Sequence, residues 1–177
     1  MRRATEAEAE IEFRDFVLGT RARLVKFAEF LTGDIGIAED LVQHAHAKIY
    51  ARWPKLQSGN PEAYARRCII NAHTDRWRRG SSKEQPLDHT VDPADSFSIS
   101  AVNAERDVVM RALRRLTKRE RTIIALKYYC DLSNDQIARD LGIATATVRT
   151  TVFRALVKLR EDHDLTRERV EENERRA

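Results

Sequence analysis

The chain has 177 residues, and its 32 Lys and Arg residues against 28 Asp and Glu residues leave a net charge of only +4. A chain of this length folds into one domain or two small ones. It has no run of about eighteen apolar residues, which excludes insertion into a membrane as a spanning helix. Because Gly and Pro are few and apolar residues recur at helical spacing, we expect an all-α protein.

The two cysteines also limit the class of protein. Cys68 and Cys130 lie in separate segments, and no spacing suits a metal site. Two lone thiols without a signal peptide are typical of a reducing compartment. We therefore expect a cytoplasmic protein without a metal or other cofactor.

Two helices are predicted at the start of the chain. The first begins at Ile11, after ten charged, alanine-rich residues that we expect to be frayed, and ends at Gly33. One of its sides is apolar: Phe13, Phe16, Val17, Leu24, Phe27 and Leu31. Asp34 can cap the second helix, and Pro54 is expected to end it. Its core residues recur every four positions: Ile37, Leu41, Ala45, Ile49 and Trp53.

The second helix contains the string AEDLVQ, from Ala38 to Gln43. The residues on its outward side are Glu39, Asp40, Gln43 and Lys48. Composition alone favours an ordinary solvated helix face for these residues.

A third helix is predicted from Pro61 to Arg79, after a loop over residues 55–60. Asn60 and Pro61 are a capping residue and a first-turn proline in their preferred positions. The expected core face is Ala65, Cys68, Ile69 and Ala72, and the other side carries Tyr64, Arg67, Asn71, Asp75, Arg78 and Arg79. Arginines with aromatic rings and an amide suit nucleic acid. The alternative is an amphipathic helix whose aromatic residues, Trp77 in particular, belong to the core.

The segment 80–100 is rich in Ser, Asp and Pro and has no helical period, so we interpret it as a linker. It divides the chain into helical domains over residues 11–79 and 101–161. The charged tail, residues 162–177, fits either a short helix or a disordered segment.

The second domain begins with a helix over residues 102–116. Its apolar stripe is Val102, Val109, Ala112, Leu113 and Leu116. Thr117 and Glu120 have the spacing of a capping box, which starts a further helix. The expected core residues of that helix are Ile123, Ile124 and Leu126.

The stretch from Ser133 to Arg160 predicts a helix-turn-helix. Ser133 and Gln136 form another capping box, Gly142 suits a left-handed turn, and Thr145 is placed to cap the second helix. That helix contains no acid, and its bases are Arg149, Arg154, Lys158 and Arg160. A cationic exposed face on the second helix of such a pair is typical of binding in the major groove. A plain helical hairpin is the weaker alternative.

Together these segments resemble an RNA polymerase sigma factor of the extracytoplasmic-function group, in the sigma-70 superfamily. AEDLVQ and NPEAYARRCIINAHTDRWRR resemble the first domain of that group, sigma region 2. LRRLTKRERTIIALKYYCDLSNDQIARDLGIATATVRTTVFRALVKLR resembles the second, sigma region 4. The resemblance covers about residues 11–161, and it departs at Thr151, where many relatives have a basic residue.

The resemblance implies a function and a set of site residues. It implies that the chain binds core RNA polymerase and starts transcription at promoter DNA, with an anti-sigma factor as a further partner. Contacts with the polymerase are implied for Asp40, Leu41 and Gln43. Contacts with the −10 promoter element are implied for Ser58, Asn60, Asn71, Arg76, Arg78 and Arg79, with Asn71 and the loop 57–60 taking a flipped base. Contacts with the −35 element are implied for Thr147, Arg149, Thr150, Phe153 and Arg154.

Two other classes of function are weaker. A stand-alone helix-turn-helix regulator would bind paired half-sites as a dimer, without polymerase. An enzyme is disfavoured, because His44 and His46 are two residues apart and do not share a helix face. The sequence also offers no Ser-His-Asp set, phosphate-binding glycine loop or convergent pair of carboxylates.

Overall fold

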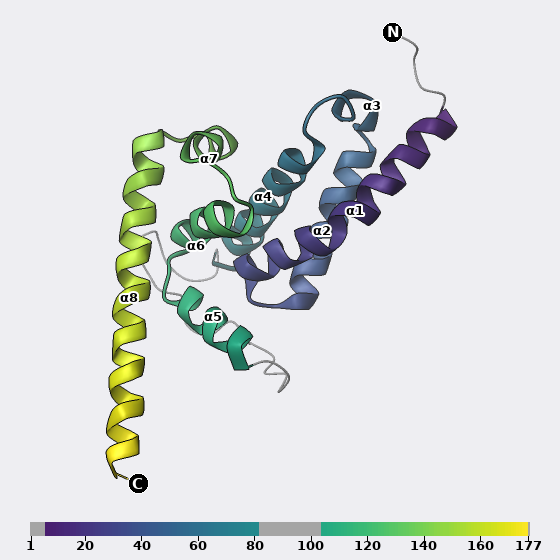
Figure 1. Cartoon of the computed structure of the whole chain (residues 1–177). Helices are drawn as coiled ribbons and strands as arrows, with labels where there is room; N and C mark the ends of the chain where they lie inside the picture. Colours follow the sequence, from purple (N-terminus) through teal and green to yellow (C-terminus); the bar gives the residue numbers. More distant parts are fainter. Residues whose placement is uncertain (1–5, 82–103, 177) are drawn as a thin grey trace. The chain divides into compact units, whose positions relative to one another are not determined.

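The computed structural model describes residues 6–81 and 104–176 of the chain, with side chains over 7–76 and 108–161 (Figure 1). Every regular element in these residues is helical, which confirms the all-α prediction. Contacts divide the chain into two compact units, Met1–Leu87 and Asp88–Ala177. Most of the predicted linker, residues 80–100, lies outside the described residues, and Gly80 and Ser81 end a helix.

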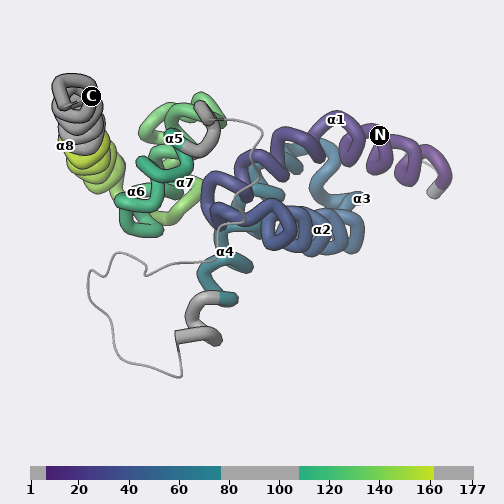
Figure 2. Tube along the Cα trace, turned by 90° about the horizontal axis from the view of Figure 1, so that it is seen from below, coloured from purple at the N-terminus to yellow at the C-terminus, as the bar shows by residue number. Residues whose placement is uncertain are grey.

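The first unit contains α1 (Glu6–Thr32), α2 (Ile35–Tyr50), α3 (Trp53–Leu56) and α4 (Pro61–Ser81). Helix α2 packs against both α1 and α4, and α1 and α2 lie side by side in Figure 1 and Figure 2. The core of this unit contains side chains that are almost fully buried: Leu24, Phe27, Leu31, Val42, Ile49 and Ile69.

Local capping fixes the junctions between these helices. Gly33 ends α1 with a φ of 73°, and the Asp34 carboxylate then accepts a hydrogen bond of 2.8 Å from the backbone N–H of Ile37. Asn60 caps α4 in the same way, accepting a 2.9 Å bond from the backbone N–H of Ala63. Both caps satisfy N–H groups that have no partner within the helix. Both are the caps that the sequence predicts, so the structure confirms them.

Two boundaries in the first unit differ from the prediction. Helix α1 begins at Glu6, so residues 6–10, expected to be frayed, are helical. Alternating Glu and Ala favour a helix, and Glu suits the positive end of its dipole. Helix α2 ends at Tyr50, and Pro54 lies in the first turn of α3, where its missing N–H has no cost.

An aromatic cluster holds α3 against α1. Trp53 is 6% exposed, and its ring centroid lies 5.3 Å from that of Phe13 and 5.3 Å from that of Phe16. Tyr50 lies beside the same cluster, 5.0 Å from Phe13. Tilted and edge-on contacts at these distances are favourable between aromatic rings.

The second unit contains α5 (Ala104–Arg114), α6 (Lys118–Ile124), a π-helical turn η1 (Ala125–Tyr129), α7 (Asn134–Leu141) and α8 (Thr145–Arg176). Its core is formed by Met110, Leu113, Leu116, Ile123, Leu126, Ile137, Val148 and Ala155. The prediction of Val109 as a core residue is wrong, because Val109 is 49% exposed and Met110 takes its place at 4%. Helix α8 continues to Arg176, so the helical alternative holds for residues 162–176.

Glu120 joins three parts of the second unit. Its carboxylate completes the predicted capping box by accepting a 2.8 Å bond from the backbone N–H of Thr117. It also accepts bonds of 2.8 and 2.9 Å from the Lys158 ammonium of α8. Burial by itself raises the pKa of Glu120, but the bonds from Lys158 and Thr117 outweigh it, so the pKa lies below its ordinary value.

We expect Glu120→Gln to lower the free energy of unfolding of the second unit at pH 7 by about 1.5 to 3 kcal/mol, the range for hydrogen bonds to charged groups. Because the pKa of Glu120 is lowered, its contribution is complete above the ordinary carboxyl pKa and is lost as the pH falls through the lowered pKa. The destabilisation should therefore shrink in acid. Urea titrations followed at the α6 amide signals by NMR measure this.

The matched control is Glu161→Gln, which neutralises an exposed acid on α8. It should leave the stability nearly unchanged. An equal effect of both substitutions, or a loss for Glu120→Gln that persists in strong acid, would contradict a stabilising role for the charge of Glu120.

Candidate nucleic-acid interface

The second unit contains a helix-turn-helix formed by α7 and α8. In Figure 1, α7 lies beside the N-terminal end of α8, and the two helices are in contact. Ser133 and Gln136 form the predicted capping box, with bonds of 2.8 and 3.2 Å. Gly142 ends α7 in the left-handed conformation, with φ of 65° and ψ of 37°. Ile137 and Val148 are both fully buried, and they anchor the two helices in the same core.

The prediction that Thr145 caps α8 is wrong. Thr145 is the first residue of the helix, and Ala144 precedes it. The Thr145 hydroxyl instead donates a 2.8 Å hydrogen bond to the Asp135 carboxylate of α7. This bond crosses the turn, so it contributes to the angle between the two helices.

The exposed side of α8 carries most of the residues predicted to enter the major groove. Arg149, Thr150 and Arg154 are exposed, Phe153 is 68% exposed, and Thr147 is half-buried. The Thr150 hydroxyl donates to the Ala146 carbonyl at 3.0 Å, so its proton is already engaged within the helix. Guanidinium groups in such a position can bind guanine edges or phosphates in bidentate geometry.

The charge of α8 is less uniform than the sequence suggests. Lys158 is bound to Glu120, which neutralises one of the four bases between Thr145 and Arg160. Arg149 and Arg154 therefore carry the positive charge of the first turns, where the recognition helix of such a motif contacts bases. Sequence reasoning missed this pairing, because the two residues are 38 positions apart.

In the first unit, the predicted nucleic-acid residues lie at two points along α4. Ser58 and Asn60 are exposed at its N-terminal end, and Asn71 is exposed eleven positions after Asn60. At the rise of an α-helix this separation is roughly 16 Å. The structure therefore does not bring the loop 57–60 and Asn71 together around a single base. Arg76 is exposed, and the side chains of Arg78 and Arg79 lie outside the described residues.

Arg52 is a cation near this loop that sequence reasoning missed. Its guanidinium donates a 3.0 Å bond to the Tyr64 hydroxyl and lies 5.9 Å from the centroid of the Tyr64 ring. Arg52 follows the end of α2, outside any periodic pattern, so no sequence signal pointed to it.

The residues of the string AEDLVQ on α2 differ in how exposed they are. Asp40 and Gln43 are exposed, whereas Leu41 is 6% exposed and packs in the core. Glu39 lies 3.6 Å from the Arg21 guanidinium in an exposed ion pair. Asp40 has no ion pair with any residue that the structure describes. An acid and an amide are thus available on this face, and Leu41 contributes packing rather than exposed surface.

The histidines and cysteines form no metal site in the described part of the chain. His44 is exposed, and His46 is half-buried with its ring edge toward Phe16. Burial, and then the charge of Arg21, lower the pKa of His46. Burial raises the pKa of Cys68, and neither Cys68 nor Cys130 forms a disulfide. None of the helices in the described ranges has the length and apolar character that a membrane span requires.

Comparisons with known proteins agree with the two-unit arrangement. The family profile for sigma-70 region 2 matches residues 16–83, and that for sigma-70, region 4 matches residues 106–159. The RNA polymerase sigma-E factor of Streptomyces coelicolor is 32% identical over 170 residues, which cover 93% of this chain and 95% of that protein. The ECF RNA polymerase sigma factor SigL of Mycobacterium tuberculosis is 32% identical over 147 residues, with coverages of 78% and 81%.

Two solved structures share the fold. The sigma factor RpoE of Bartonella quintana, crystallised with the anti-sigma factor NepR, has a TM-score of 0.67 and 24% identity, and the match covers 84% of this chain and 94% of RpoE. CnrH, solved with the cytosolic domain of CnrY, has a TM-score of 0.61 and 20% identity, with coverages of 86% and 88%.

The turn of the helix-turn-helix gives a direct test of this geometry. A Cβ atom at Gly142 would meet nothing within 4 Å, so Gly142→Ala adds only the strain of a positive φ. We expect it to lower the free energy of unfolding of the second unit by about 1 kcal/mol. Gly142→Asn should cost less, because Asn adopts this conformation more readily. NMR-detected urea titration measures both, and equal stability of the alanine variant and the wild type would contradict the left-handed turn.

Proposed function

The chain belongs to the extracytoplasmic-function sigma factors of the sigma-70 family, and from this we propose that its two units bind different promoter elements. As a sigma factor, it binds core RNA polymerase and promoter DNA and directs transcription initiation. Sigma factors are regulatory proteins without catalytic activity of their own.

The second unit binds the −35 element with the exposed face of α8. The observation that carries this assignment is the position of Arg149 and Arg154 on one exposed helix face, with Phe153 between them 68% exposed. An arginine can discriminate guanine by a bidentate pair, and an apolar ring can contact the methyl group of thymine. The complete set for this contact is Thr147, Arg149, Thr150, Phe153 and Arg154.

The first unit binds the −10 element along α4 and the loop before it. Because the two groups of residues are separated along the helix, we assign them to two different nucleotides of the strand. Ser58 and Asn60 contact one nucleotide, and Asn71 contacts another. Arg76, Arg78 and Arg79 then bind phosphates at the end of the helix. Capture of an unstacked base offsets a few kcal/mol of unpairing cost, which favours melting of the promoter.

The outer face of α2 binds core polymerase through Asp40 and Gln43. Asp40 is exposed and has no ion pair with the described side chains, so it gives up no such interaction with them when it binds a cation on a partner. Leu41, which the resemblance also implicates, supports this surface from the core. RpoE of Bartonella quintana was solved with an anti-sigma factor, and we propose that a protein of that kind regulates this chain as well.

The two units act together only when the polymerase holds both of them. One bidentate pair between a side chain and a base gives about 1 to 3 kcal/mol of discrimination, which is too little for a specific site on its own. Joint attachment to the polymerase raises the effective concentration of the second unit at its element once the first is bound. Two weak contacts thereby become one specific recognition event.

Arg154→Ala tests the −35 assignment. We expect about a tenfold loss of promoter-directed transcription, which is within the range for one base contact. Affinity for core polymerase should be unchanged, because α8 lies outside the proposed polymerase surface. The control is Arg111→Ala, which removes an exposed arginine of α5. Loss of transcription and of polymerase binding together would show that this helix face has another role.

Asp40→Ala tests the polymerase contact. We expect the dissociation constant for core enzyme to rise about tenfold, as for a charged contact that is truncated at an interface. Glu12→Ala, an exposed acid of α1, is the matched control and should have no effect. Fluorescence titration with core polymerase measures both variants. An unchanged affinity for Asp40→Ala would remove this residue from the contact.

A further inference from the structure

A group of cations without acidic partners lies at the end of α2 and along the first half of α4. Five bases of the first unit do have an acidic partner: Arg14, Arg21, Arg23, Lys26 and Arg66. Four exposed bases have none among the described residues: Lys48, Arg52, Lys55 and Arg67. Glu62 is the only acid in residues 41–71. Its carboxylate already binds Arg23 at 2.6 Å and Arg66 at 3.4 Å, so it does not neutralise the four.

One stripe of α4 joins the two nucleotide contacts that we propose for this unit. Its members follow one another at steps of four, three and four residues, which places them on one side of the helix: Asn60, Tyr64, Arg67 and Asn71. Arg67 is exposed and Tyr64 is half-buried. The roughly 16 Å of helix between Asn60 and Asn71 therefore carries an arginine on the side that faces the strand.

Tyr64 holds a second arginine beside this stripe. The Arg52 guanidinium donates a 3.0 Å hydrogen bond to the Tyr64 hydroxyl and lies 5.9 Å from the centroid of the Tyr64 ring. A guanidinium has five N–H donors, so the donors that are not bound to Tyr64 can bind phosphate oxygens. Because the contact with Tyr64 restricts the Arg52 side chain in advance, less conformational entropy is lost when it binds an anion.

The buried thiol of Cys68 reports how close the cations are to one another. Burial raises the pKa of Cys68, while a hydrogen bond with Tyr64 and the charges of Lys48, Arg52 and Arg67 oppose that effect. Positive charges from the last turn of α2, from the residues after it and from α4 thus act on a single sulfur atom. Such a concentration of one sign of charge attracts a polyanion.

We propose that Arg52 and Arg67, with Lys48 beside them, form a phosphate-binding track, which holds the DNA backbone between the nucleotide at Asn60 and the nucleotide at Asn71. The track rests on the proposed function, in which one strand of the −10 element follows α4. Two different nucleotides of a strand have at least one phosphate between them, and that phosphate lies where the track is. Phosphate contacts carry no sequence information, so the track positions the strand, and Asn60 and Asn71 contact its bases.

NMR titration of the full chain, without polymerase, tests the track. The probe is an oligothymidine of about twelve nucleotides, which has phosphates but no promoter sequence. The signals of the Arg52 side chain and of the Tyr64 and Arg67 amides should shift, with a dissociation constant on the order of 100 µM at low salt. Absence of a shift at Arg52 and Arg67 overturns the track.

Salt dependence tests whether the contact is with phosphate. Followed at the Tyr64 signal, Arg52→Ala and Arg67→Ala should each weaken binding of oligothymidine about threefold to tenfold at low salt. Each should also reduce the slope of log affinity against log salt by about 0.7, the value for one phosphate of a single strand. Both residues are exposed, so the variants fold, and circular dichroism checks this. A loss of affinity with an unchanged slope overturns the phosphate contact.

Tyr64→Phe tests whether Tyr64 positions Arg52. The variant removes the hydroxyl but keeps the ring and every charge. Followed at the Arg67 signal, binding of oligothymidine should weaken about twofold to threefold with an unchanged salt slope, because Arg52 is less restricted before it binds. Wild-type affinity of Tyr64→Phe overturns the positioning role.

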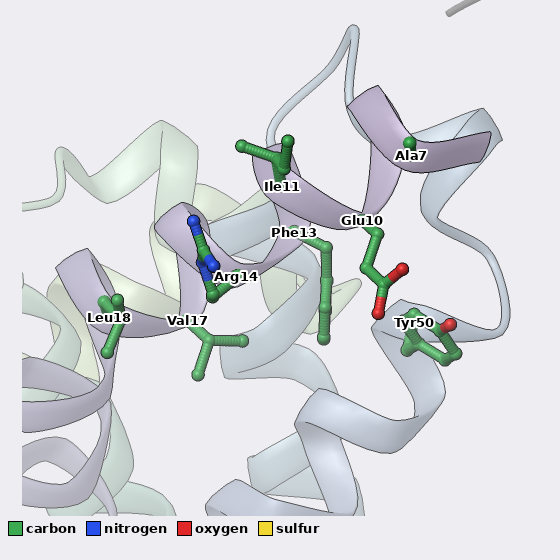
Figure 3. A pocket seen from close by; sticks show the side chains of 8 residues that line it. All are labelled: Ala7, Glu10, Ile11, Phe13, Arg14, Val17, Leu18 and Tyr50. Carbon is green, nitrogen blue, oxygen red and sulfur yellow. The ribbon is translucent and has the colours of Figure 1, made fainter. Parts of the chain in front are cut away.

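Arg14→Ala is the matched control, because it lowers the net charge of the first unit by the same amount. Arg14 lines an apolar groove of about 560 Å³ along the N-terminal half of α1, together with Phe13, Leu18 and Tyr50 (Figure 3). The control should change neither the affinity nor the slope measured at Tyr64. An effect equal to that of Arg52→Ala would mean that net charge alone attracts the oligonucleotide, which overturns the proposal.

Transcription by core polymerase separates the track from the proposed function. Arg52→Ala and Arg67→Ala should lower initiation about threefold to tenfold at promoters that differ in their −10 sequence, whereas Asn71→Ala should change the preference among them. Full initiation by variants that no longer bind oligothymidine overturns the place of the track on the promoter. A wild type that binds oligothymidine through Arg52 and Arg67 but starts no transcription contradicts the proposed function and supports the phosphate contact alone.

Discussion

The division of α8 into a buried side and an exposed side is the constraint on which the second unit depends. Val148 and Ala155 are fully buried, while Arg149 and Arg154, each next to one of them in the chain, are exposed. Any rotation of α8 that exposed the arginines differently would also pull these residues out of the core. The Lys158–Glu120 bonds fix the same helix one turn beyond Arg154. The core therefore fixes the direction in which the proposed −35 residues point.

Helix α2 of the first unit is divided in the same way into a buried side and an exposed side. Leu41 and Val42 are buried, whereas Asp40 and Gln43 on either side of them are exposed, so one short string both builds the core and presents the proposed polymerase surface. Helix α1 packs against α2 and begins at Glu6. The apolar residues of its N-terminal half line the groove of Figure 3.

Local interactions could be predicted from the sequence, and distant ones could not. The caps at Asp34, Asn60, Thr117 and Ser133, and the turn at Gly142, depend on residues within four positions of one another, and the structure confirms each of them. Local spacing predicts Thr145 as a cap, but it does not reveal the partner that the Thr145 hydroxyl has in the structure, Asp135, which lies ten residues away. The pairing of Lys158 was hidden for the same reason, and the stripe of α5 was shifted by one residue at Val109 because a short helix fixes its phase poorly.

The central claim is that two cationic helical units recognise promoter DNA specifically only when core polymerase holds them together. Its most direct test compares start-site-specific transcription by core polymerase plus the full chain with binding of the same promoter duplex by the chain alone, at equal concentration and salt. The account predicts initiation at defined start sites in the first experiment and only weak, salt-sensitive binding in the second. Tight binding of the duplex by the free chain, with no initiation on any promoter, would contradict it.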